Sequence, residues 1–168
     1  MTITHCWGVD PGFASSPTGV ALVRFDGLTL RLVDCWTLKS ERGDWQTRCD
    51  AVLFRLSRLI LPRRAELTAL CYELSWVGEN AQSALKLRDL GGGVRGLAVG
   101  FGLACIGVQP AESKRALAGD GRADKQQMIA AARQVFGVTL NEHEADAAAH
   151  ALAGEAELRV RKLIARAG

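Results

Sequence analysis

The sequence lacks the cysteine pattern of a disulfide scaffold or of a zinc cluster. It contains five cysteines, which are widely separated, and no two of them form a CxxC pair. Secreted disulfide frameworks normally carry an even number of cysteines at characteristic spacings. We therefore expect free thiols and a reducing compartment, which is the cytoplasm.

Long apolar runs are also missing. The longest uncharged stretch covers residues 96–111, which is shorter than the ~20 residues that a membrane-spanning helix needs. The first residues contain neither the basic segment nor the apolar segment of a signal peptide. We therefore expect no insertion into a membrane.

Internal repeats, low-complexity tracts and linkers are absent, and neither sign of charge dominates. The 168 residues fit one domain, and we treat residues 1–168 as a single unit. An apolar fraction of 48% and a charged fraction of 23% are typical of a globular protein. The 21 basic and 18 acidic residues leave a net charge of +3, which permits a nucleic-acid partner without requiring one.

The hydrophobic pattern predicts an α/β fold. Apolar runs predict strands at residues 6–10, 18–25, 30–38, 68–73 and 104–108. Helical spacing predicts helices at residues 44–61, 80–99, 125–136 and from 141 onward. The first three strands form a meander with a tight turn at Asp26-Gly27. Helices and strands alternate after it, which predicts a five-stranded mixed sheet flanked by helices on both faces.

Carboxylates stand at the ends of two predicted strands. Asp10 ends the first strand and Glu73 ends the fourth, and sites in α/β sheets gather at such ends. His143 and Asp146 are spaced i, i+3 on the last helix, which places both on one face. Clustered carboxylates repel one another unless a cation neutralises them. Mg²⁺ or Mn²⁺ would do so, and the imidazole favours Mn²⁺.

The same residues also permit a purely structural interpretation. In that alternative Asp10 caps a turn, Glu73 pairs with an arginine, and His143 and Asp146 open an ordinary helix. Spacing alone does not decide between a metal site and these separate structural roles.

Short motifs follow one another along nearly the whole chain. They are Gly8-Val-Asp10-Pro-Gly12, Tyr72-Glu73, Asn80-Ala-Gln-Ser-Ala-Leu-Lys-Leu87, Glu112-Ser-Lys114 and His143-Glu-Ala-Asp146. The block at residues 80–87 is the most specific of them. In order and spacing the set resembles the RuvC family of Holliday junction resolvases, which belongs to the RNase H-like superfamily. The resemblance implies an RNase H-like fold for residues 1–168.

The resemblance also implies which residues act. Four of them, Asp10, Glu73, His143 and Asp146, would be catalytic ligands of two Mg²⁺ or Mn²⁺ ions. Two such ions ~3.5–4 Å apart can clamp the attacking and leaving oxygens of a phosphodiester. Lys114 matches a family lysine near the active site, where it would act on the scissile phosphate as a positive charge.

Other residues are candidates for DNA contacts. Trp76 falls where the family carries an aromatic side chain that stacks on a junction base, and Lys125 matches a lysine that approaches the phosphates. Lys86, Arg88 and Arg115 belong to basic clusters, and such residues contact the DNA backbone without reading sequence. The structural alternatives are a loop or core anchor for Trp76 and solvated surface positions for the lysines.

His150 is a departure from the motif of the resembling family. It follows Asp146 by one helical turn, where many members have Asp-Ala-Leu-Ala. It is either a partner of the metal ligands or a helix residue facing a gap in the core or solvent, and we favour the second interpretation.

Glycines at positions 92, 96 and 100 leave one face of a predicted helix without side chains. A second backbone can approach such a face closely. In the resembling family this helix lies at a two-fold dimer interface, and packing against the chain's own sheet is the other interpretation.

Taken with the resemblance, these residues predict a homodimeric, metal-dependent endonuclease selective for four-way DNA junctions. Each subunit would nick one of two symmetry-related strands and leave a 5′ phosphate and a 3′ hydroxyl. One alternative is a nuclease of the same fold that cuts flaps or forks, and another is a junction-binding protein without catalysis. Branch-migration proteins are further candidate partners.

Overall fold

A five-stranded mixed sheet lies at the centre of the molecule, with strand order β3-β2-β1-β4-β5. The structure is a computed structural model, and it describes residues 3–12, 16–27, 29–39, 42–74 and 81–167. The strands are β1 (Thr4–Asp10), β2 (Thr18–Asp26), β3 (Thr29–Leu38), β4 (Ala69–Glu73) and β5 (Ala104–Val108). The first three form an antiparallel meander, whereas β1, β4 and β5 run parallel.

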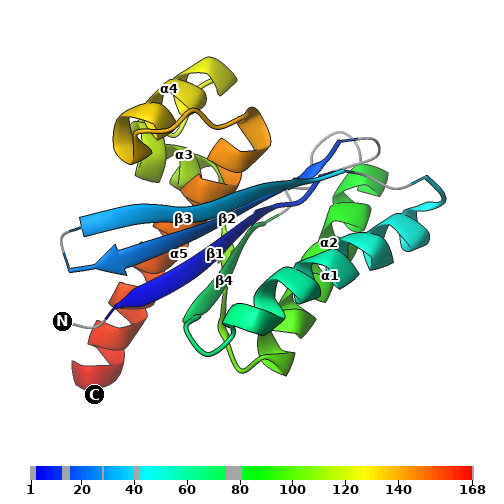
Figure 1. Cartoon of the computed structure of the whole chain (residues 1–168), viewed down its shortest axis with the longest axis horizontal. Helices are drawn as coiled ribbons and strands as arrows, with labels where there is room; N and C mark the ends of the chain where they lie inside the picture. Colours follow the sequence, from blue (N-terminus) through cyan, green and yellow to red (C-terminus); the bar gives the residue numbers. More distant parts are fainter. Residues whose placement is uncertain (1–2, 13–15, 28, 40–41, 75–80, 168) are drawn as a thin grey trace.

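Helices cover both faces of this sheet (Figure 1). One face carries α1 (Trp45–Ile60), which continues into the short 3₁₀ helix η1 (Leu61–Arg63), and α2 (Ala81–Gly100). The other face carries α3 (Pro110–Ala118), α4 (Lys125–Phe136) and α5 (Glu142–Ala167). The predicted five-stranded mixed sheet with helices on both faces is confirmed.

The two central strands bury different side chains on their two faces. Trp7 of β1 packs with residues of α1 and α2, whereas Cys6 packs toward α5. In β4, Cys71 also packs toward α5. Successive side chains of a strand point to opposite faces. Asp10 is four residues after Cys6, and Glu73 is two residues after Cys71. An even spacing keeps a side chain on the same face, so Asp10 and Glu73 also face α5.

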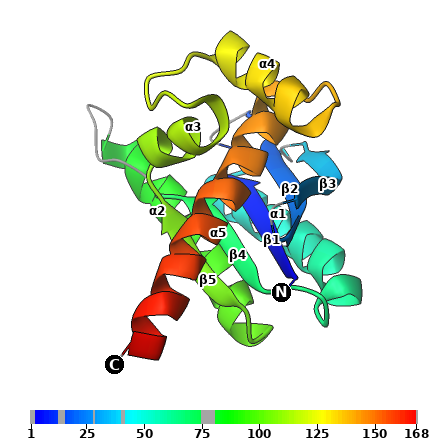
Figure 2. The same cartoon turned by 90° about the vertical axis from the view of Figure 1, so that its left-hand side faces the viewer.

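Helix α5 lies directly on the sheet because glycines leave room for its backbone. A Cβ added at Gly8 would overlap the carbonyl group of Ala147 and lie 2.9 Å from the backbone nitrogen of Ala151. A Cβ at Gly19 would overlap the carbonyl group of His143. Figure 2 shows α5 running across one face of the sheet. These glycines therefore set how closely the first turns of α5 approach the end of β1.

The sequence patterns assigned no element between residues 108 and 125, and the structure has α3 in this segment. Pro110 ends the preceding strand and also opens the helix, where its missing N–H is not needed. Gln109 and Glu112 form a capping box, and Gly119 follows the last turn with φ of 78°. The start and stop signals of α3 are therefore present in the sequence.

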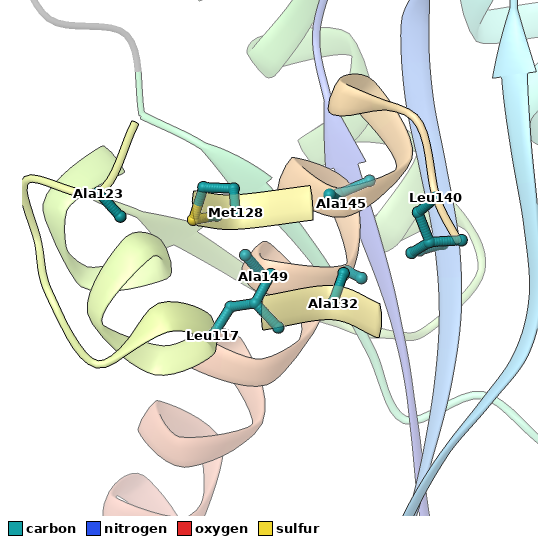
Figure 3. Packing of buried hydrophobic residues seen from close by; sticks show 10 residues of the cluster. Leu117, Ala123, Met128, Ala132, Leu140, Ala145 and Ala149 are labelled. Atoms are coloured by element: carbon teal, nitrogen blue, oxygen red, sulfur yellow. The ribbon is translucent and has the colours of Figure 1, made fainter. Parts of the chain in front are cut away.

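Helix α3 shares a small apolar core with α4 and the first half of α5. Leu117 of α3 belongs to one buried cluster with Met128 and Ala132 of α4 and Ala149 of α5 (Figure 3). Close packing of this kind fixes the relative positions of the helices. The cluster thus holds α3, and with it Lys114, beside the beginning of α5.

All five cysteines of the chain have free thiols, and Cys6, Cys49 and Cys71 are buried. A free cysteine in a core behaves as a small apolar side chain. Among the ranges described, no helix combines the length and apolar character needed to cross a membrane.

Candidate active site

Asp10 and Glu73 meet because their strands are neighbours. β1 and β4 pair in parallel with Val9 opposite Tyr72, so both acids follow this pair at the same end of the sheet. Their side chains are 16% and 31% exposed. Two partly buried carboxylates therefore share one face of the sheet, beneath α5.

Helix α5 brings two further side chains to the same place. The side chain of Asn141 accepts a hydrogen bond from the backbone of Glu144, whose side chain accepts one from the backbone of Asn141. This capping box determines where the helix begins. His143 and Asp146 then lie on the same face of its first turns. The Nδ1 atom of His143 is 3.1 Å from Oδ2 of Asp10.

The ionisable side chains at this site have shifted pKa values, because they are partly buried and close to one another. Burial, followed by the charges of Asp10 and Asp146, raises the pKa of Glu73 to about 7. Burial and then Asp10 raise the pKa of Asp146 to about 6. The hydrogen bond to Asp10 is the main cause of a raised pKa at His143. Lys114 acts in the opposite direction on both acids and lowers their pKa values. The five groups thus lie within electrostatic reach of one another.

We expect Glu73→Gln to raise the unfolding temperature of the metal-free protein at pH 8. Folded Glu73 keeps its proton up to about pH 7, whereas its ordinary pKa is 4.5. Its contribution to stability is therefore complete below pH 4.5 and is lost as the pH rises through 7. Glutamine carries no charge, so the gain should be present at pH 8 and absent at pH 4. Calorimetry in EDTA measures the difference.

The matched control for that measurement is Glu66→Gln, since Glu66 is exposed. It should leave the unfolding temperature unchanged at both pH values. Equal unfolding temperatures for wild type and Glu73→Gln at pH 8 would show that the buried carboxylates do not destabilise one another.

Three side chains at this end of the sheet offer the ligand atoms of a divalent cation site. Ligand atoms of Asp10, Glu73 and His150 all lie within 4.8 Å of one another. A cation would neutralise the negative charges of Asp10 and Asp146, which add to the effect of burial in raising the pKa of Glu73. Carboxylate oxygens suit Mg²⁺ and Mn²⁺, and an imidazole nitrogen adds a ligand for the softer ion. The acids thus lie close enough together for a shared cation site, and the role of each as a metal ligand stays a prediction.

His150 is the residue whose favoured interpretation the structure corrects. We expected it to face solvent or a gap in the core. Its side chain is instead 1% exposed, and Nε2 lies 3.6 Å from Oε2 of Glu73. The spacing i, i+4 from Asp146 was the signal available in the sequence, because residues at this spacing share a helix face.

The two lysines expected near the reacting phosphate lie beside the acids. Lys114 projects from α3 within electrostatic reach of Glu73 and Asp146. The Nζ atom of Lys125, at the start of α4, is 2.6 Å from Oε2 of Glu142. That bond, and more weakly the charges of Asp146 and Asp10, raise the pKa of Lys125. Both lysines therefore add positive charge around the cluster.

The remaining candidates for DNA contacts lie elsewhere on the fold. Lys86 and Arg88 are on α2, on the opposite face of the sheet from α5. Arg115 is exposed on α3. Trp76 falls outside the described residues.

The glycine stripe of α2 points away from the molecule. A Cβ added at Gly92, Gly96 or Gly100 would meet no atom of the described residues within 4 Å. Gly91 and Gly93 are the glycines that pack inward, against Tyr72 and Leu53. Packing of the stripe on the chain's own sheet, which was one of the two interpretations, is therefore wrong.

Comparisons with known proteins agree with this geometry. The sequence model of the family described as "Crossover junction endodeoxyribonuclease RuvC" matches residues 6–154. RuvC of Halorhodospira halophila is 37% identical over 153 residues, which cover 89% of each chain. RuvC of Nitratidesulfovibrio vulgaris is 33% identical over 131 residues, covering 78% of this chain and 76% of the relative.

A structure of T. thermophilus RuvC in complex with a Holliday junction substrate is also similar. Its TM-score is 0.78 at 25% identity, over 92% of this chain and 96% of that chain. The predicted resemblance and fold are thus confirmed. With the acids of β1, β4 and α5 at one end of the sheet, this chain belongs to the RuvC family of crossover junction endodeoxyribonucleases.

Proposed function

We propose that this chain is a metal-dependent DNA endonuclease that resolves four-way junctions by paired nicks. The observation that carries the proposal is the meeting of Asp10, Glu73, His143 and Asp146 from three distant stretches of the chain. Its relatives are crossover junction endodeoxyribonucleases. The complex of the related T. thermophilus protein with a Holliday junction supports the class of substrate.

Each residue of the cluster has a role in this proposal. The two carboxylates of the strands, together with His143 and Asp146, would hold two Mg²⁺ or Mn²⁺ ions. When bound, these ions would activate water for attack and stabilise the leaving 3′ oxygen. The imidazole of His143 is oriented by the hydrogen bond that its Nδ1–H donates to Oδ2 of Asp10. Lys114 offsets part of the negative charge and can contact the scissile phosphate as a positive charge.

Further contacts would position the DNA. Lys125 adds positive charge on the α4 side of the acids. Lys86, Arg88 and Arg115 would contact phosphates, which gives affinity that falls steeply with salt. Trp76 follows β4 and would stack on a base, a contact worth about 1–3 kcal/mol per base.

Paired nicks require two active sites, which a homodimer supplies. We propose that the two subunits associate through α2. Its glycine stripe is open to the outside, and the apolar side chains of Leu85 and Val99 on the same helix are 60% and 70% exposed. A helix face without side chains permits close approach of a second helix. A homodimer formed through α2 would cover this apolar surface.

Gly96→Leu should therefore convert a dimer into a monomer. The new side chain enters open space in the subunit, and leucine favours the helix over glycine by up to ~1 kcal/mol, so the subunit should stay folded. Sedimentation velocity measures the oligomeric state, and junction cleavage should change from paired to single nicks. Ala130→Leu, an exposed position on α4, is the control and should stay dimeric. A Gly96→Leu dimer that still makes paired nicks would exclude α2 as the interface.

A cleavage assay tests the function itself. Four-way junctions, forks, flaps and linear duplex are compared with Mg²⁺, with Mn²⁺ and with EDTA. We expect metal-dependent, symmetric nicks in the junction whose 5′ phosphate and 3′ hydroxyl ends can be ligated. Preferential cutting of flaps or forks would show that the substrate is another branched DNA and not the four-way junction. Junction binding without cutting would show that the chain is a junction-binding protein and not a nuclease.

Two further parts of the proposal concern the cellular setting. Branch-migration proteins would be partners, since a junction that moves must be presented to the nuclease. A cytoplasmic location agrees with the five free cysteines, because the cytosol keeps thiols reduced. Co-purification with branch-migration proteins in the presence of junction DNA would test the first part.

A further inference from the structure

His150 is a buried polar side chain without a hydrogen-bond partner in the described part of the chain. It lies on α5, one turn beyond Asp146, and only 1% of it is exposed. Among the described residues, neither Nδ1 nor Nε2 has a hydrogen-bond partner. Buried polar groups are nearly always paired, so an unpaired imidazole points to a ligand that would complete it.

The unpaired ring faces the acids of the cluster. Its Nε2 atom is 3.6 Å from Oε2 of Glu73. One ligand atom from each of Asp10, Glu73 and His150 also lies within 4.8 Å of the other two. A small divalent cation lies about 2.1 Å from each ligand, so neighbouring ligand atoms of one ion are about 3–4 Å apart. The separation between Glu73 and His150 is in this range.

We propose that His150 is a nitrogen ligand of the cation held by Asp10 and Glu73, and that it makes this cation site prefer Mn²⁺ to Mg²⁺. The inference rests on the proposed function, because it places a further ligand in the same metal site. Imidazole nitrogen suits first-row transition ions, whereas Mg²⁺ prefers oxygen ligands. His150 then supplies from the core a bond that the carboxylates alone cannot offer.

Pulsed EPR of bound Mn²⁺ tests the bond directly. The chain has three histidines, and ¹⁵N-histidine labelling makes any histidine nitrogen bound to Mn²⁺ visible. We expect ¹⁵N coupling to persist in His143→Leu and to disappear when His150→Leu is added. Bound Mn²⁺ without ¹⁵N coupling in His143→Leu would overturn the role of His150 and leave the metal site standing. Wild-type protein that binds no Mn²⁺ would overturn the proposed function as well.

Calorimetric titration with each ion gives a second readout that does not depend on cleavage. His150→Leu should weaken Mn²⁺ binding by about 10–100-fold, the range seen when groups around a metal are removed, and Mg²⁺ binding by less than about 3-fold. An equal loss for both ions would mean that His150 only positions Glu73, and would overturn the proposal. His5→Gln is the control, since His5 lies near the opposite end of β1. Circular dichroism in EDTA confirms folding, and the EPR result on His143→Leu stands without the His150 variant.

Discussion

Asp146→Asn is expected to reduce cleavage of a four-way junction by about 10³-fold or more while leaving junction binding intact. Asparagine has the shape of aspartate without its charge, so it cannot hold a cation at the cluster. Ions that stabilise reacting phosphate oxygens contribute several kcal/mol, and each 1.36 kcal/mol is a factor of ten in rate. Junction binding should be kept, because the basic residues that contact phosphates elsewhere on the surface do not depend on the Asp146 carboxylate. Gel-shift and single-turnover cleavage assays measure the two properties separately.

The folded state of Asp146→Asn should be at least as stable as that of the wild type without metal. Burial and Asp10 raise the pKa of Asp146 to about 6, so its charge opposes folding above that pH. Glu157→Gln is the control on the same helix, because Glu157 is exposed and pairs with Arg161. It should cleave at the wild-type rate. Full cleavage by Asp146→Asn would remove this residue from the set of ligands.

Gly8→Ala should lower the free energy of unfolding by about 3 kcal/mol or more, the upper end of overpacking effects. The added Cβ would overlap the carbonyl group of Ala147 and lie 2.9 Å from the nitrogen of Ala151. Both obstacles are backbone atoms of α5, so no side chain can rotate to make room. The helix itself would have to move away from β1. Chemical denaturation measures the loss of stability.

Displacement of α5 from β1 in Gly8→Ala should also reduce cleavage by the fraction of the variant that remains folded. His143 and Asp146 are carried by the first turns of α5, and Asp10 is carried by β1, so separating the two elements opens the site. Ala130→Leu is the control, because it enlarges an exposed side chain on α4 and leaves the contact between β1 and α5 unchanged. Its stability should stay within about 0.5 kcal/mol of the wild type, and its cleavage should be unchanged. Gly8→Ala with wild-type stability and cleavage would show that α5 tolerates a shift.

Much of the active site could be predicted because its signals are local. The alternation of side chains and the strand ends at Asp10 and Glu73 are visible within a few residues. The spacing of His143 and Asp146 follows from helix geometry alone. Helix α3 was missed although its capping box and Gly119 are also local, because Pro110 serves equally well as a strand end and as the first residue of a helix.

Other properties depended on which elements became neighbours. The i, i+4 spacing places His150 on the same helix face as Asp146, but only the packing of α5 on the sheet shows that the side chain is buried beside Glu73. The outward direction of the α2 glycines required knowing that Gly91 and Gly93 face Tyr72 and Leu53. Both are consequences of packing between segments far apart in the chain.

The sequence by itself determined the strands and most of the helices, the residue types of the site and the family. Those depend on backbone periodicity, turn chemistry and motifs that lie within short segments. Only the tertiary structure decided that β1 lies beside β4, that α3 brings Lys114 to the acids, and that His150 is buried against Glu73. The physical reason is that side-chain direction, burial and charge repulsion are set by neighbours that the linear order of residues does not specify.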